Sequence, residues 1–188
     1  MLGRIVGRLL RGFRAGEKTL LWHHPVAVAA PTCIELHSPA FAALTTIPAQ
    51  HAGLGIGANR SPALAWRGVP EAAVELLLVI EDASAPLPKA FVHAIGIGIS
   101  AQRCELAEGA LNGAGGAVRQ LGRNTFGRAD YAGPRALPGH GPHRYSWQLF
   151  ALDSRLDFAR PPGREQLISA MAGKVIGRGR LDGIFERV

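Results

Sequence analysis

The sequence predicts an all-β protein, an antiparallel β-sandwich with peripheral helices and an amphipathic helix at the N-terminus. The first indication is the run at residues 74–81, whose nearly continuous apolar side chains are typical of a strand covered on both faces. The second is that no long helical pattern separates the strand-like segments between residues 34 and 152, which favours antiparallel pairing over parallel βαβ units. Helical spacing returns only at residues 164–171.

The remaining predicted strands are shorter or less continuous. Residues 91–99 alternate in character, and the strand period places His93 on the same inward-facing row as four apolar residues. Residues 59–66 are expected to be a loop that closes into a short strand, with Trp66 in the core. Further strands are expected at residues 33–36, 145–152 and 183–187.

The first 22 residues form the one clearly amphipathic segment. Five basic residues recur at three- and four-residue steps on one face, and apolar residues occupy the other. Such a helix either lies on an anionic membrane surface or packs its apolar face on the domain or on a second subunit of a homodimer. We favour packing. The chain is therefore divided into a basic amphipathic helix with an extended lead-in, residues 1–30, and a domain, residues 31–188.

Composition restricts the class of protein. With 188 residues, 47% hydrophobic and 19% charged, the chain suits one globular domain. The net charge of +7, from 18 Arg and three Lys against 14 acidic residues, favours anionic partners. Nucleic acid is not expected, because the basic residues do not interleave with aromatic ones. No apolar run could span a bilayer and no signal peptide is recognisable, so we expect a cytoplasmic location. Cys33 and Cys104 are expected to be buried, reduced thiols, and no cofactor is expected.

Groups that could bind a ligand or react occur at three places. An Asp before a turn usually caps that turn, and a His on an apolar face is usually hydrogen-bonded in the core, so each alone has a structural explanation. A Gly- and Pro-rich loop with imidazole, guanidinium and phenol groups at a strand end suits a small polar ligand. The three places are Asp82 after the strongest strand, His93 on the inward row, and the loop at residues 131–145 with His140, His143 and Tyr145.

Five motifs in this order resemble the phosphatidylethanolamine-binding protein family, also called Raf kinase inhibitor-like proteins. The resemblance covers about residues 34–188 and leaves out the N-terminal helix. It implies an antiparallel β-sandwich with a small anion pocket at one end. The motifs are Asn59-x-Ser61-Pro62-x-Leu64-x-Trp66, Asp82-x-x-x-Pro86, Phe91-Val92-His93, Tyr131-x-Gly133-Pro134, and His143-Arg144-Tyr145 followed by Phe150-Ala-Leu-Asp153.

The resemblance also implies which residues form the pocket. Asp82 would orient an imidazole, Tyr145 would add a hydroxyl, and backbone N–H groups near Gly133 would donate to the anion. Two residues depart from the family pattern: Ser84 stands where a second acid is usual, and Arg135 where a further Pro is frequent. Both changes would make the pocket more electropositive if Arg135 turns inward, so that the pocket binds a more highly charged anion or no longer binds a cationic headgroup that the second acid could have paired with. The expected ligand-binding residues are Asp82, Ser84, His93, Gly133, Pro134, Arg135, His143 and Tyr145.

The function expected from these features is non-catalytic binding of a phosphoryl or carboxylate ligand or of a phospholipid headgroup, with a regulatory role toward a protein partner. No catalytic residue and no bound metal are expected. One alternative is a metal-dependent hydrolase that uses Asp82, His93 and His143, with His140 as a further ligand. A less favoured alternative is acyl transfer by a Ser-His-Asp set with Ser84, which lacks the strand–turn–helix context of an exposed nucleophile. His140 is expected at the pocket rim, and Arg144 in a structural ion pair.

Overall fold

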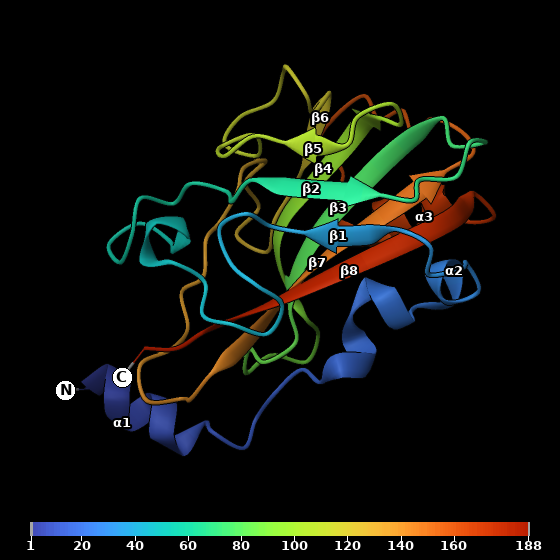
Figure 1. Ribbon diagram of the computed structural model, residues 1–188. Coiled ribbons are helices and arrows are strands. Elements are labelled where there is room, and N and C mark those ends of the chain that lie inside the picture. Colours follow the sequence, from blue (N-terminus) through green and yellow to red (C-terminus); the bar gives the residue numbers. More distant parts are fainter. Residues whose placement is uncertain (1, 188) are drawn as a thin grey trace.

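The computed structural model describes residues 2–187 and consists of two antiparallel sheets with short peripheral helices (Figure 1). The larger sheet has five strands in the order β6-β4-β3-β7-β8, and the smaller has three in the order β1-β2-β5. The antiparallel prediction is therefore confirmed. The strands are β1 (Glu35–His37), β2 (Leu64–Arg67), β3 (Glu75–Asp82), β4 (Phe91–Ser100), β5 (Glu105–Leu106), β6 (Gln120–Gly122), β7 (His143–Leu152) and β8 (Val175–Phe185), and the helices are α1 (Leu2–Leu9), α2 (Pro25–Val28) and α3 (Arg164–Met171), with 3-10 turns at Glu17–Thr19, Leu21–His23 and Ala49–His51.

Strand β3 lies at the centre of the larger sheet, and every one of its residues is buried. Its even-numbered apolar residues face a core shared with the smaller sheet, which includes Trp66 and Trp147. Its odd-numbered apolar residues Leu77 and Val79 face a second core beneath α3 and the N-terminal lead-in. The sheet is thus covered on both faces, as the unbroken apolar run predicted.

The single inward-facing row predicted for β4 is wrong, because two bulges interrupt the strand period. Leu76 pairs with Ile99 but Leu78 pairs with Gly96, so an extra residue lies near Gly98, whose φ is +71°. Ile95 and Ile97 consequently face the core beneath α3, whereas Ile99 faces the core between the sheets. Since a bulge adds one residue to one strand, it reverses the side-chain alternation beyond it.

The N-terminal segment does not form one helix. Helix α1 ends at Leu9, and the chain then turns through Gly12 into two 3-10 turns. Of the apolar face that was expected to pack on the domain or on a second subunit, Leu9 and Phe13 do not pack on the domain, since they are 74% and 65% exposed. Ile5 is also exposed, at 55%. Contact with the domain is made instead by the small residue Gly7, at which a Cβ atom would collide with the carbonyl oxygen of Pro138.

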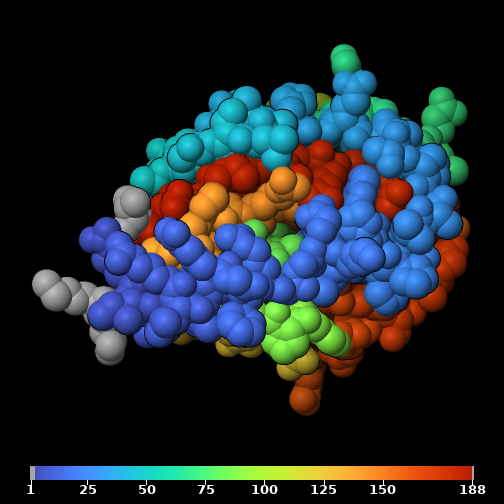
Figure 2. Space-filling view, turned by 90° about the horizontal axis from the view of Figure 1, so that it is seen from below, coloured from blue at the N-terminus to red at the C-terminus, as the bar shows by residue number. Residues whose placement is uncertain are grey.

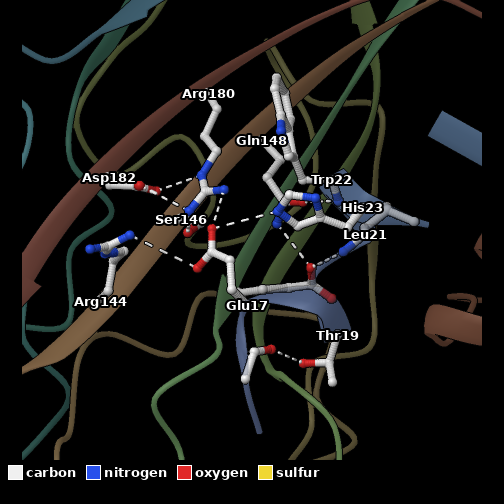
Figure 3. A network of polar contacts seen from close by, with 12 residues as sticks. Glu17, Thr19, Leu21, Trp22, His23, Arg144, Ser146, Gln148, Arg180 and Asp182 are labelled. Carbon is white, nitrogen blue, oxygen red and sulfur yellow. Dashed lines mark hydrogen bonds and ion pairs between the residues drawn. The ribbon is translucent and has the colours of Figure 1, made fainter. Parts of the chain in front are cut away.

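The lead-in after α1 is fixed on the face of the larger sheet, on β7 and β8 (Figure 3). The Glu17 carboxylate contacts the guanidinium of Arg180, which also donates to Asp182 at 2.8 and 2.9 Å. The backbone N–H of Trp22 donates to the Gln148 side chain at 2.6 Å, and Leu21 beside it is fully buried. Residues 17–24 are therefore part of the folded core, whereas α1 lies outside it.

Two further expectations are corrected. Cys33 and Cys104 are free but exposed, not buried. The final strand is much longer than predicted and runs over Val175–Phe185, because its glycines at alternate positions obscure the strand pattern in the sequence. None of the helices within residues 2–187 has the length and apolar character needed to cross a membrane.

Candidate functional site

A cavity of about 270 Å³ lies where β3 ends and β4 and β7 begin, beside the loop after Tyr131. Side chains from three neighbouring strands meet there, because Asp82 pairs with both Phe91 and Tyr145 in the sheet. Most of the predicted site residues are brought together, with an apolar wall around them. The lining consists of Asp82, Ala85, Pro86, Leu87, Phe91, His93, Phe126, Gly133, Arg135, Leu137, His143 and Tyr145.

Asp82 orients one imidazole. Its Oδ2 atom accepts a hydrogen bond from Nδ1 of His143 at 2.7 Å, and its Oδ1 atom accepts the backbone N–H of Ser84, also at 2.7 Å. The Asp82 and His143 side chains are both almost fully buried. A buried carboxylate needs such donors, since each lost hydrogen bond would leave an unsolvated charge.

His140 extends this arrangement away from the cavity. Its Nδ1 atom lies 2.8 Å from Nε2 of His143, and its Nε2 atom faces the carbonyl oxygens of Leu10 and Phe13 at 2.9 and 3.2 Å. With Asp82 ionised, three contacts need one proton each. They are the contacts of Asp82 with His143, of His143 with His140, and of His140 with the carbonyl oxygen of Leu10. The rim position expected for His140 is wrong, because its side chain is fully buried.

Both ring nitrogens of His143 are thus engaged by protein groups. His143 lines the cavity with its ring, but neither nitrogen remains to donate to a ligand or to bind a metal ion. Within residues 2–187, no three His, Cys, Asp or Glu side chains are grouped as metal ligands would be.

His93 differs from the other buried histidines, His51, His140 and His143, because one of its nitrogens has no partner among the described residues. Its Nδ1 atom lies 2.5 Å from the carbonyl oxygen of Ala132, which identifies Nδ1 as the protonated nitrogen. Its Nε2 atom is buried without a hydrogen bond to any described residue. Burial lowers the pKa of His93, although the nearby Asp82 carboxylate acts in the opposite direction. Burial therefore favours the neutral imidazole of His93, in which Nε2 is an acceptor.

Tyr145 packs against His93 with ring centroids 5.0 Å apart and an edge-on geometry. Burial raises the pKa of Tyr145 well above its usual value, and the Asp82 carboxylate raises it further. Its side chain therefore remains a phenol at any ordinary pH. A phenol retains a proton that it can donate to an anion.

The loop after Tyr131 is shaped by Asn59. The Asn59 side chain donates to the carbonyl oxygen of Tyr131 at 3.0 Å and accepts the backbone N–H of Gly133 at 2.8 Å. The expected donation from Gly133 to an anion is therefore not supported, because its N–H already has a partner. Pro134 is buried and does not line the cavity; its carbonyl oxygen accepts the backbone N–H of Gly53.

Ser84 and Arg135, the two departures from the family pattern, lie in different places. Ser84 does not line the cavity; its hydroxyl accepts the backbone N–H of Arg144 at 3.0 Å. Arg135 is exposed and lines the cavity, with its side chain extended along Gly53. Arg144 lies on the outer side of β7, 4.0 Å from the Glu17 carboxylate, in the ion pair expected for it.

The apolar wall could not be recognised in the sequence. Phe126 is 59% exposed at the cavity and packs edge-on against Phe91, with centroids 5.0 Å apart. Leu87 and Leu137 complete this wall. Phe126 lies in the long stretch between β5 and β7, which has no periodicity to indicate a direction for its side chain. Leu87 follows Pro86, and Leu137 precedes Pro138. Both lie in loops, where no periodicity indicates the direction of a side chain.

Two antiparallel sheets with a small, partly polar cavity at one end of the larger sheet define the class of this protein. Residues 37–186 match the family described as phosphatidylethanolamine-binding protein, and the chain belongs to that family. Helix α1 and the lead-in precede the matched residues.

Relatives with similar sequences and structures agree with this assignment. A UPF0098 protein of Pyrococcus abyssi is 37% identical over 145 residues, which are 75% of this chain and 79% of the relative. The crystal structure of a phosphatidylethanolamine-binding protein homologue from Chlamydia trachomatis is 30% identical, with a TM-score of 0.74 over 84% of this chain and 99% of that one. Escherichia coli YbcL has the same fold at 23% identity, with a TM-score of 0.75 over 82% of this chain and 99% of its own.

Proposed function

We propose that this protein is a non-catalytic binding module for a small anionic group, a phosphoryl, sulfate or carboxylate group, carried by a free ligand or by a phospholipid headgroup. The observation that carries the proposal is the Nε2 atom of His93, a residue that lines the cavity: this atom is buried and has no hydrogen-bond partner among the described residues. A buried polar atom without a hydrogen bond costs about 1–3 kcal/mol. An anionic ligand removes that cost when His93 takes up a proton at Nε2 and donates it to the anion.

The charges around the cavity favour an anion over a cation. The Asp82 carboxylate is engaged by Nδ1 of His143 and by the backbone N–H of Ser84. Arg135 lines the cavity with a charged side chain that forms no ion pair with a carboxylate within residues 2–187, and Tyr145 supplies a neutral hydroxyl donor. An anion bound between them would also favour the protonated form of His93.

The same geometry supports a binding role over the two catalytic alternatives. Ser84 lies outside the cavity, so a Ser-His-Asp set is not assembled there. The metal-dependent hydrolase would need lone pairs from His143, and both of its nitrogens contact other side chains. No observation favours either alternative over binding.

Thermal unfolding in the presence of sulfate tests this proposal. Because sulfate binding to the native state raises the unfolding temperature by linkage, we expect the temperature to be constant at low sulfate and then to rise with the logarithm of the sulfate concentration above the dissociation constant. Arg135→Gln should weaken sulfate binding severalfold, since it removes the exposed cation of the cavity. Arg103→Gln, a change at an exposed arginine that does not line the cavity, should have no effect.

Two results would contradict the proposal. One is equal sulfate stabilisation of wild type, Arg135→Gln and Arg103→Gln, which would show a general salt effect. The other is a stoichiometric metal ion together with a chelator-sensitive hydrolytic activity, which would favour the hydrolase.

A further inference from the structure

We propose that α1 and the turn after it, residues 2–13, dock this protein on the surface of an anionic lipid bilayer. The first observation is an apolar face that the domain does not cover. Ile5, Val6, Leu9 and Phe13 are 55%, 39%, 74% and 65% exposed. Six other large hydrophobic side chains of the described chain are 41–64% exposed, but two of them, Leu87 and Phe126, lie at the cavity and the other four are in separate segments.

The orientation of α1 leaves this face outward. Gly7 lies against the backbone of Pro138 and His140, and the backbone of Arg4 lies against Gly139. Since helical residues turn by about 100° each, Leu9 lies on the side opposite to Gly7. The helix is therefore attached through its glycine side, and Figure 2 shows the segment on the surface of the molecule.

The charges next to the apolar face identify the partner. Arg4, Arg8, Arg11 and Arg14 are all exposed, and residues 2–16 contain no acidic residue. Within residues 2–187, none of the four arginines forms an ion pair with a carboxylate. Apolar side chains flanked by unpaired arginines complement a bilayer with anionic headgroups. A second copy of the chain fits less well, because its arginines would approach those of the first.

The length of α1 limits the way in which it meets the bilayer. Eight residues rise about 12 Å, far less than the hydrocarbon thickness, so α1 would lie in the interface. Gly3 and Gly7 weaken the isolated helix. Its attachment to the loop at Pro138–His140 keeps it helical and fixes its orientation before it meets lipid.

Docking would also orient the cavity, a consequence that rests on the proposed function. The backbone N–H of Ala15 donates to the carbonyl oxygen of Ala85, and Ala85 lines the cavity. In Figure 2 the N-terminal segment and the loop after β3 lie side by side on the same face. The partly exposed Leu87 and Phe126 at the cavity would then face the headgroup region.

Sedimentation with vesicles tests the inference on the full-length protein. We expect binding to phosphatidylcholine vesicles that contain about one-third phosphatidylglycerol, weaker binding in high salt, and little binding to pure phosphatidylcholine. Leu9→Ser/Phe13→Ser should weaken binding by about tenfold or more, because it removes two anchors. Arg4→Gln/Arg8→Gln should also weaken it. The matched controls are Val28→Ser/Leu44→Ser, at exposed apolar residues elsewhere, and Arg103→Gln/Arg155→Gln.

Sulfate stabilisation of the same variants separates this inference from the proposed function. All of these substitutions are at exposed residues, so folding and sulfate binding should be unchanged. Failure to bind anionic vesicles while sulfate still stabilises the protein would overturn the docking inference and leave the cavity proposal standing. Equal binding by the α1 variants and their controls would also overturn it, as would a dimer in solution that Leu9→Ser/Phe13→Ser dissociates.

Discussion

The imidazoles of His140 and His143 are joined edge to edge, with Nδ1 of one 2.8 Å from Nε2 of the other. This contact connects the carboxylate of Asp82 at the cavity to the carbonyl oxygens of Leu10 and Phe13. The two carbonyls belong to the turn after α1. The N-terminal segment is therefore attached to the cavity wall by a continuous series of hydrogen bonds through the protein interior.

His140→Ala should release this segment. The substitution removes the donor to the carbonyls of Leu10 and Phe13 and leaves Nε2 of His143 without its partner. We expect a loss of about 1–3 kcal/mol in the free energy of unfolding. Trypsin should also cleave the variant after Arg11 and Arg14 faster than it cleaves the wild-type protein, because residues 2–14 open locally more often.

The control for this substitution is His37→Ala, at an exposed histidine of β1. It should change neither the stability nor the cleavage rate. If His140→Ala destabilised the whole protein but left cleavage after Arg11 and Arg14 unchanged relative to the rest of the chain, the connection to the N-terminal segment would be contradicted.

Sulfate affinity should increase as the pH falls, and His93 should account for the increase. Burial lowers the pKa of His93 in the empty protein, so the native state takes up this proton at lower pH than the unfolded chain. As the pH falls through about 6.5, the unfolded chain binds more protons than the native state, and the free energy of unfolding decreases. A bound anion raises the pKa of His93, so anion binding takes up a proton and strengthens in acid.

Sulfate is the suitable probe because it remains a dianion, whereas phosphate itself titrates in this range. Between about pH 8 and pH 6 we expect the sulfate affinity of the native protein to increase severalfold, measured by calorimetry. His93→Asn should remove most of this slope, and His37→Asn should retain it. If the sulfate affinity of both variants depended equally on pH, the dependence would be due to another group, such as His140, whose pKa is lowered by burial and by the neighbouring His143.

Ser84→Asp should leave the preference between phosphate and phosphoethanolamine unchanged, contrary to the expectation from the sequence. The Ser84 side chain points to the backbone of Arg144 and not into the cavity. A carboxylate there would lie near Arg144 and would not contact a cationic headgroup. Affinity for both ligands, measured in parallel with Arg135→Gln, checks this, and a selective gain in phosphoethanolamine binding would show that Ser84 does reach the ligand.

The sequence was most informative where local composition decides the structure. The unbroken apolar run of β3 identified a strand with two covered faces, and the spacing of residues 164–171 gave the bounds of α3. The prediction of a single inward-facing row on β4 was wrong, because the positions of bulges depend on the pairing with the partner strand. The second bulge lies between the pairs Ile80–Ala94 and Glu81–Val92, and His93 is its extra residue. Pairing, not alternation, therefore places His93 at the cavity.

Site residues were predicted well at strand ends and poorly in loops. Asp82 and Tyr145 are paired across β3 and β7, so their positions follow from the sheet. Ser84 lies two residues beyond β3, where the strand period no longer sets a direction. Phe126 has no regular element to orient it, and His140 acquires its role only from the N-terminal carbonyls, which are about 130 residues away in sequence.

Arg164→Ala should be the most destabilising of the substitutions considered. Glu81 is fully buried: its Oε1 atom accepts Nε of Arg164 at 2.6 Å, and its Oε2 atom accepts the backbone N–H of Leu21 and the Gln148 amide at 2.7 and 2.9 Å. Without Arg164, a buried carboxylate loses its cation, which costs about 3–5 kcal/mol in the free energy of unfolding. Urea denaturation measures this loss.

A neighbouring ion pair, between Glu165 of α3 and Lys89 in the loop before β4, provides the control. Lys89 and Glu165 lie 2.8 Å apart, but both side chains are about two-thirds exposed, at 68% and 66%. Lys89→Ala should cost less than about 1 kcal/mol, because water already solvates both charges. Glu81→Gln/Arg164→Met, which removes the buried charge together with its partner, should recover part of the stability lost in Arg164→Ala. If Arg164→Ala and Lys89→Ala were equally stable, or the double variant were less stable than Arg164→Ala, the buried ion pair would not be the cause of the effect.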